Sequence, residues 1–106
     1  RFRNGLHLVH AGSTVPSREH IAMTVDVLRG AGVSVDDSVP NEWKVAPGPI
    51  RAFDVAIEPD LSNAGPFLGA ALVAGGTVRL HGWPEHTTQV GDRWRSILPG
   101  WHGGAA

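Results

Sequence analysis

The chain contains no cysteine, and this absence excludes three kinds of protein at once. Disulfide scaffolds, thiolate metal sites and enzymes with a cysteine nucleophile all require that residue. An excess of charge of one sign is also lacking, because nine Lys and Arg residues oppose ten Asp and Glu residues and leave a formal net charge of −1. Without a basic field the chain cannot hold a nucleic-acid backbone, so we expect no nucleic-acid partner.

Long apolar runs are lacking as well. The longest, residues 66–74, contains Gly69 and is followed by Gly75 and Gly76, so it is much shorter than a membrane span. No apolar signal core follows residues 1–5. We therefore expect no membrane partner and a cytoplasmic location. The sequence does not begin with methionine, and we expect it to be an internal piece of a longer protein.

The residues that are present suit one ordinary folded domain, or one unit and part of another. The chain has 106 residues, 42% of them hydrophobic and 18% charged. A chain of this length buries roughly 60–70% of the surface that it exposes when unfolded. Fourteen glycines and eight prolines are many, but the apolar residues between them recur in regular patterns, which excludes a wholly disordered chain.

The clearest pattern predicts a helix over residues 17–29. Ile21, Val25 and Leu28 fall on one face at helical spacing. Ser17 is a favoured N-cap residue, and we expect its side chain to cap the first turn.

The remaining pattern predicts five short strands and two further helices. The second helix should begin at Asp60 or Ser62 and end before Gly75. This order describes an α/β or α+β chain in which a helix-and-hairpin unit starts to repeat after Glu58. The expected strands cover residues 6–9, 33–35, 43–45, 53–57 and 77–80, and the last short helix covers residues 89–98.

The start of the first helix is one candidate site. Exposed N–H groups and the helix dipole attract an anion there, Ser17 adds a hydroxyl, and Arg18 and His20 add charge or a donor. The alternative is a plain cap, with Arg18 and His20 in solvent.

A second candidate site lies at the start of the second helix. Asp60 stands beside Ser62 and Asn63, and this acid could orient a polar ligand, although plain capping is again the alternative. The histidines do not suggest a metal site, because His7 and His10 lie three positions apart on an expected strand and point to opposite faces.

Three segments, taken in order, carry a resemblance to a known family. Residues 15–24, with the glycine-rich stretch 30–33, follow the pattern of one of its helices. Residues 57–68 and 75–78 are similar to its acid-Asp-x-Ser-Ser/Asn-Ala helix and its Gly-Gly-Thr turn, and residues 88–92 match its Gln-Gly-Asp segment. Over most of its length the chain thus resembles the EPSP synthases (3-phosphoshikimate 1-carboxyvinyltransferases), above all the actinobacterial members.

The resemblance implies a transferase of chorismate and aromatic amino-acid biosynthesis. Members transfer the enolpyruvyl group of phosphoenolpyruvate to the 5-hydroxyl of shikimate 3-phosphate, need no metal or organic cofactor, and are the target of glyphosate. Their fold has two similar domains, each of three β-α-β-α-β-β units, with the active site in the cleft between them. Residues 1–57 would then be the end of one domain, and residues 58–106 the start of the other.

The resemblance also implies roles for the candidate residues. Ser17 aligns with a serine that binds the phosphate of shikimate 3-phosphate, and His20 stands where many members have a tyrosine that touches the same substrate. Arg18 matches a basic position in some members. Asp60 matches an acid near the interdomain cleft, with an indirect role on the phosphoenolpyruvate side.

The departures from the family pattern are informative too. The catalytic acids, the N-terminal lysine and the downstream arginines of the family have no counterpart here, so the chain alone is expected to be catalytically incomplete. After about residue 95 the sequence is altered. Because half of the usual packing partners of residues 61–106 are missing, we expect exposed apolar surface there, with self-association or a need for the rest of the enzyme.

Two alternatives remain at this point. One is a stand-alone α/β module that binds a phosphorylated metabolite at Ser17 without chemistry. The other is a part of the related UDP-N-acetylglucosamine enolpyruvyl transferase, which shares the fold and phosphoenolpyruvate but fits the segment around Ser17 less well.

Overall fold

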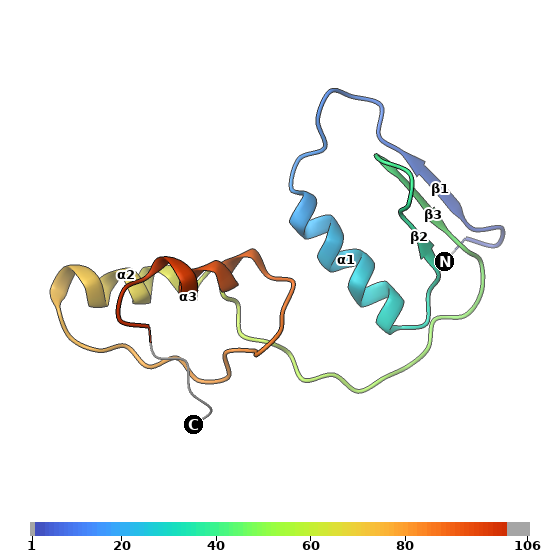
Figure 1. The fold of residues 1–106 in the computed structure, drawn as a ribbon. Coiled ribbons are helices and arrows are strands. Elements are labelled where there is room, and N and C mark those ends of the chain that lie inside the picture. Colours follow the sequence, from blue (N-terminus) through green and yellow to red (C-terminus); the bar gives the residue numbers. More distant parts are fainter. Residues whose placement is uncertain (1, 102–106) are drawn as a thin grey trace. The chain divides into compact units, whose positions relative to one another are not determined.

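The computed structural model describes residues 2–101, and within the chain it defines two compact units (Figure 1). The N-terminal unit is Arg1–Val55 and the C-terminal unit is Ala56–Ala106. The division falls just before Glu58, where the sequence suggested the start of a repeat. That the two units belong to different domains of a larger enzyme stays a prediction.

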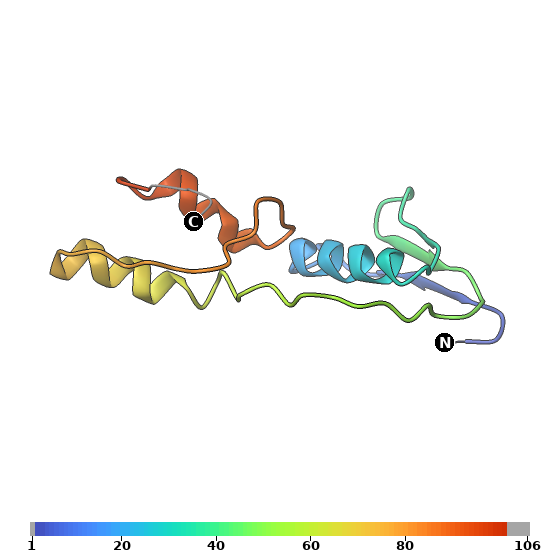
Figure 2. The same cartoon turned by 90° about the horizontal axis from the view of Figure 1, so that it is seen from below.

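The N-terminal unit is one helix on a small antiparallel sheet. Strands β1 (Leu6–Val9), β2 (Val35–Asp36) and β3 (Glu42–Val45) form the sheet in the order β1-β3-β2. Helix α1 (Arg18–Gly30) lies alongside this sheet (Figure 2).

The core of this unit is a cluster of valines between helix and sheet. Val25 from α1 packs with Val33 and Val35, all of them buried. Trp43 and Val45 of β3 pack against this cluster from the sheet. Because strand residues alternate between faces, Trp43 and Val45 reach the helix together while Lys44 between them points away.

The C-terminal unit has three short helical segments and no strand among its described residues. They are α2 (Gly65–Ala74), the 3₁₀ helix η1 (Val90–Arg93) and α3 (Trp94–Ile97). Leu61 is fully buried, and Ala64 and Leu68 are buried with little of their surface exposed. In the part of the chain that the structure describes, no helix combines the length and apolar character that a membrane crossing requires.

The mixed α/β class and most of the predicted elements are confirmed. The first predicted helix agrees closely with α1, and the strands at 6–9 and 43–45 agree with β1 and β3. The strand predicted at 33–35 is present only as the two-residue β2. The repeat unit itself stays a prediction.

Two predicted strands are wrong. Residues 53–57 and 77–80 have no regular secondary structure. Val55 and Ile57 are 63% and 86% exposed, so the alternating apolar side chains of the first segment are not buried against a core. A strand also needs a partner for its N–H and C=O groups, and neither segment has one in the described structure.

The later helices also differ in their bounds. The second predicted helix begins at Gly65 rather than at Asp60 or Ser62, because a turn at 61–64 precedes it. The last predicted helix is divided into η1 and α3. The predicted alteration after about residue 95 extends over residues 102–106, which lie outside the described residues.

Apolar side chains are exposed on both units, although the sequence suggested this only for residues 61–106. Leu8 lies opposite Trp43 on the sheet face toward α1, yet it is 52% exposed. In α2, Phe67 is 63% and Val73 is 90% exposed. Self-association through these side chains stays a prediction.

Gly91 and Leu61 lie so close that only glycine fits at position 91. A Cβ there would lie 2.6 Å from the carbonyl carbon of Leu61 and 2.8 Å from its oxygen. We expect Gly91→Ala to lower the free energy of unfolding of the C-terminal unit by about 1–3 kcal/mol, because the Leu61 backbone must shift. Urea unfolding followed at the NMR signals of α2 measures this change.

Gly69→Ala is the matched control. Position 69 is inside α2, and a Cβ there meets nothing within 4 Å. Alanine at this position should raise the stability by about 0.5–1 kcal/mol through helix propensity. Equal stability of the two variants would contradict the close approach of Gly91 and Leu61.

Candidate functional site

The start of α1 is built on an unusual serine. Ser17 has φ 53° and ψ 48°, the left-handed conformation, and its side chain makes no capping hydrogen bond. Its carbonyl oxygen instead accepts hydrogen bonds from the N–H groups of His20 at 3.0 Å and Ile21 at 3.2 Å. The predicted side-chain cap is therefore wrong. A capping side chain normally requires an extended backbone at that residue, and the left-handed one directs the hydroxyl elsewhere.

This backbone arrangement has a chemical consequence. A left-handed residue followed by helical residues turns successive backbone N–H groups toward one side and forms a concavity that suits an anion. The dipole of the 13-residue helix α1 adds partial positive charge at the same end. Ser17 is exposed and its hydroxyl is not used by the helix, so it is available to an anion there.

Arg18 points to a different neighbour. Its Nη2 donates to Oδ1 of Asn41 at 3.3 Å. Asn41 is itself in the left-handed region with φ 62°, and its carbonyl oxygen accepts the N–H of His10 at 2.9 Å. Arg18 thus joins the start of α1 to the segment before β3.

Arg18 also lines a cavity of about 190 Å³ between α1 and residues 37–43. Neither Ser17 nor His20 lines this cavity. The structure therefore places Arg18, but not Ser17 or His20, at this cavity. Side chains that line the cavity include Val25, Asp37, Asn41, Glu42 and Trp43.

The acids of this cavity, Asp37 and Glu42, have side-chain partners. Asp37 accepts a hydrogen bond from Arg29 at 3.0 Å, and Glu42 lies 2.9 Å from Nε2 of His7. Both pairs are substantially exposed, and such pairs contribute little to stability in water.

Asp60 uses its carboxylate locally. Oδ1 accepts the N–H groups of Ser62 and Asn63, both at 3.0 Å, and Oδ2 accepts the Asn63 amide at 2.9 Å. These bonds close the turn at 61–64, whereas α2 itself begins after Ala64 without a side-chain cap. Residues 60–63 are held together by these bonds.

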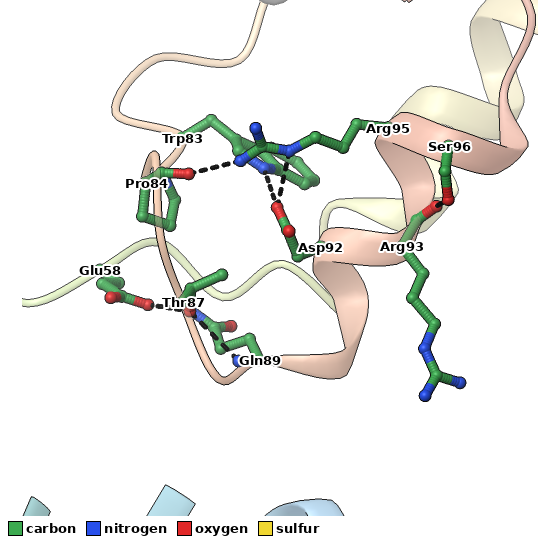
Figure 3. A network of polar contacts seen from close by, with 9 residues as sticks. All are labelled: Glu58, Trp83, Pro84, Thr87, Gln89, Asp92, Arg93, Arg95 and Ser96. Atoms are coloured by element: carbon green, nitrogen blue, oxygen red, sulfur yellow. Dashed lines mark hydrogen bonds and ion pairs between the residues drawn. The ribbon is translucent and has the colours of Figure 1, made fainter. Parts of the chain in front are cut away.

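Sequence analysis missed the residue that holds this turn from outside. The Gln89 side chain accepts the N–H of Leu61 at 2.9 Å and donates to the Pro59 carbonyl at 3.0 Å and to Glu58 at 2.8 Å. Thr87 donates to the same Glu58 oxygen at 2.7 Å (Figure 3). The Gln-Gly-Asp segment was noticed only as part of the family resemblance, and no role followed from it.

Asp92 forms the second half of this network. Its Oδ1 accepts the indole N–H of Trp83 and Nε of Arg95, both at 2.8 Å (Figure 3). Arg95 also donates to the Pro84 carbonyl at 2.6 Å, and Trp83 makes an edge-to-face contact with Trp101. These bonds attach the segment before η1 to α3.

No three His, Cys, Asp or Glu side chains come close enough to hold a metal ion within residues 2–101. In the same residues, Nε2 of His10 is a buried side-chain nitrogen without a hydrogen-bond partner. The ring of His10 lies against Gly12, where a Cβ would be only 2.9 Å from that nitrogen.

Comparison with known proteins assigns the class to which these features belong. A sequence model of the EPSP synthase (3-phosphoshikimate 1-carboxyvinyltransferase) family matches residues 2–99, and the chain belongs to this family of transferases. A curated relative from Kocuria rhizophila, named 3-phosphoshikimate 1-carboxyvinyltransferase, is 54% identical over 100 residues. The alignment covers 93% of this chain and 22% of that relative, so the chain spans about a fifth of its length. The family predicted from the sequence is confirmed.

The electrostatics next to the cavity give a pH-dependent prediction. Asp36 Oδ1 accepts hydrogen bonds from the Ser38 hydroxyl at 2.6 Å and from the Ser38 N–H at 3.0 Å. These bonds hold the pKa of Asp36 below its ordinary value of 3.8, and the bond from the Ser38 hydroxyl has the larger effect. The charged Asp36 therefore stabilises the folded chain. This contribution is fully present at pH values above the ordinary pKa, and it is lost as the pH falls through the lowered pKa of the folded state.

We expect Ser38→Ala to raise the pKa of Asp36 toward its ordinary value, because the first of these bonds is removed. An NMR titration of the Asp36 carboxyl carbon measures the change. Ser34→Ala, an exposed serine on the preceding segment, should leave the titration unchanged. An unchanged pKa in Ser38→Ala would show that the hydroxyl does not stabilise the charged form.

Proposed function

We propose that this chain forms part of a 3-phosphoshikimate 1-carboxyvinyltransferase. That enzyme transfers the enolpyruvyl group of phosphoenolpyruvate to the 5-hydroxyl of shikimate 3-phosphate and releases phosphate. Family membership over residues 2–99 and the 54% identity to the Kocuria rhizophila relative support the proposal. The two substrates, the cytoplasmic location and the role in chorismate biosynthesis belong to the proposed whole enzyme.

The geometry of Ser17 is the single observation that carries the site. We propose that the phosphate of shikimate 3-phosphate binds at the start of α1, with the Ser17 hydroxyl as a donor at the positive end of the helix dipole. The left-handed backbone at Ser17 supports this, because it leaves the hydroxyl unused and turns N–H groups toward one side. Hydrogen bonds to a doubly charged phosphate are stronger than those between neutral groups.

His20 and Arg18 are the other proposed ligands of this substrate. His20 is exposed, and its backbone N–H donates to the Ser17 carbonyl. The backbone of His20 is therefore close to Ser17. Arg18 would have to leave Asn41 to reach the phosphate. Its hydrogen bond to Asn41 is long, at 3.3 Å, and a charged phosphate is a stronger acceptor than a neutral amide.

For Asp60 we propose a role through the shape of its turn. Both carboxylate oxygens already accept hydrogen bonds from residues 62 and 63. The acid therefore fixes the chain at the start of the C-terminal unit, in agreement with the indirect role that the resemblance implies. We further propose that the two units belong to the two domains of the enzyme, and that the C-terminal unit begins a β-α-β-α-β-β repeat.

A direct binding experiment tests the phosphate site. Titration of the ¹⁵N-labelled 106-residue chain with shikimate 3-phosphate should give saturable shifts at the amides of residues 17–21. Ser17→Ala should weaken binding by about tenfold or more, because one charge-assisted hydrogen bond is lost. Ser13→Ala, in the exposed loop before the helix, is the matched control and should bind normally. Equal binding by the Ser17→Ala chain would contradict the assignment.

Catalysis gives the second test. The isolated chain should show no enolpyruvyl transfer with both substrates, because the donors and acids that stabilise the transition state must converge from more of the enzyme than is present. A chimaera in which this chain replaces the matching 22% of the Kocuria rhizophila relative should regain activity. An inactive but folded chimaera would favour a binding module without chemistry. Enolpyruvyl transfer by the isolated chain would contradict the proposal that this chain is catalytically incomplete.

A further inference from the structure

The segment that connects the two units is fixed at both of its ends. At one end the Arg51 N–H donates to the carbonyl of Ala31 at 2.8 Å, and its Nη2 donates to the carbonyl of Gly30 at 2.7 Å. These two carbonyls belong to the C-terminal end of α1, so Arg51 is held on the N-terminal unit. At the other end, Glu58 and the residues after it are held by the C-terminal unit.

The residues between these ends are unattached. Residues 52–57 make no hydrogen bond or ion pair in the structure of residues 2–101. They are exposed, with Ile57 at 86%, and have no regular secondary structure. Backbone without hydrogen bonds or buried side chains has the lowest local stability in a protein.

At the fixed end on the C-terminal unit, Thr87 donates one hydrogen bond to Glu58, and a single side chain, Gln89, makes three further bonds. The amide of Gln89 binds three successive parts of the segment: the Glu58 carboxylate, the Pro59 carbonyl and the Leu61 N–H. Asp60 lies between Pro59 and Leu61, so its position follows from these bonds. Gln89 thus provides hydrogen bonds to backbone groups that a neighbouring strand would otherwise provide.

Gln89 is itself held firmly. Its backbone N–H donates to the Thr87 hydroxyl at 3.1 Å, and its carbonyl accepts the N–H of Asp92 at 3.1 Å. Two residues further on, Gly91 packs directly on Leu61. A side chain fixed at its base can hold its partners in place at little further entropic cost.

We propose that Gln89 is a positioning residue that fixes the Glu58–Leu61 turn and confines bending of the connecting segment to residues 52–57. The effect of Gln89 on catalysis rests on the proposed function. A reaction that brings together groups from two domains needs Asp60 and its neighbours at a fixed place. The structural statement itself rests only on the contacts of residues 51–61 and 87–92.

The decisive measurement is made on the 106-residue chain, by {¹H}-¹⁵N heteronuclear NOE and amide exchange. In Gln89→Ala, fast motion should extend from residues 52–57 to Leu61, and the Leu61 amide should exchange about tenfold faster or more. The amides of α2 should remain protected. Thr88→Ala, the exposed neighbour, is the matched control and should change neither quantity.

A charge exchange provides the rescue. Gln89→Glu keeps the acceptor for Leu61 but loses the donor and places a second carboxylate beside Glu58, so residue 58 should become mobile. In the double variant Glu58→Gln/Gln89→Glu the amide of residue 58 donates to the carboxylate of residue 89, so the rigidity of residue 58 should recover, whereas the Pro59 carbonyl stays without its donor. An unchanged turn in Gln89→Ala, equal loss of protection in α2, or absence of rescue would each overturn the proposal.

The catalytic consequence is measured in the chimaera. Gln89→Ala should lower kcat by about tenfold or more and leave the KM for shikimate 3-phosphate nearly unchanged, because the Ser17 site lies in the other unit. If the chimaera with the unchanged chain is inactive, the proposed function fails, while the NMR measurements still decide the role of Gln89. If the turn loosens but kcat does not fall, Gln89 is not a positioning residue for the reaction.

Discussion

The packing of Val25 on Val33 and Val35 is the contact on which the N-terminal unit depends. It places α1 on the sheet, and the start of the helix takes its position from there. The cluster is small, so the removal of any one of these side chains would leave a large part of it unfilled. Ser17 and Arg18 have their exposed places at the helix start because Val25, two turns along, is buried.

The C-terminal unit holds its helical segments together with fewer buried apolar side chains than the N-terminal unit. Among its described residues up to Trp101, Leu61 is fully buried, and the other buried apolar side chains are those of Ala64 and Leu68. Hydrogen bonds that the side chains of Gln89 and Asp92 accept connect its segments: Gln89 accepts the Leu61 N–H, and Asp92 accepts from Trp83 and Arg95. Such bonds are directional, so they determine where the backbone lies more strictly than apolar contacts of the same number would.

Local signals in the sequence were sufficient for α1 and for the Ser17 candidate. A helical apolar stripe bounded by Ser17 and by glycines depends only on neighbouring residues, and the structure agrees with it. The left-handed backbone of Ser17 was not predictable, because serine has no marked preference for it. The strands expected at 53–57 and 77–80 failed for another reason. Alternation shows that a segment is able to pair, but pairing depends on a partner distant in the sequence.

Gln89 illustrates the same limit at the site. Its partners in the turn lie 28 to 31 positions earlier in the chain, and nothing in its immediate neighbours indicates them. The family resemblance marked the segment and supplied no physical reason for it. The structure supplies one, since Gln89 provides a donor and an acceptor in a single planar group and Gly91 leaves room for Leu61.

The polar residues of the chain fall into two groups according to whether their hydrogen-bonding groups are already used. Asp60, Gln89 and Asp92 satisfy their side chains within the C-terminal unit, and groups bound in this way must first break those bonds to meet a ligand. Ser17 is different, because its hydroxyl does not cap the helix that it begins. An available donor at a positive helix end favours ligand binding, whereas a satisfied carboxylate or amide favours support of the backbone. This physical difference is the reason why we propose Ser17 for the substrate contact, and Gln89 and Asp60 for the placement of the chain.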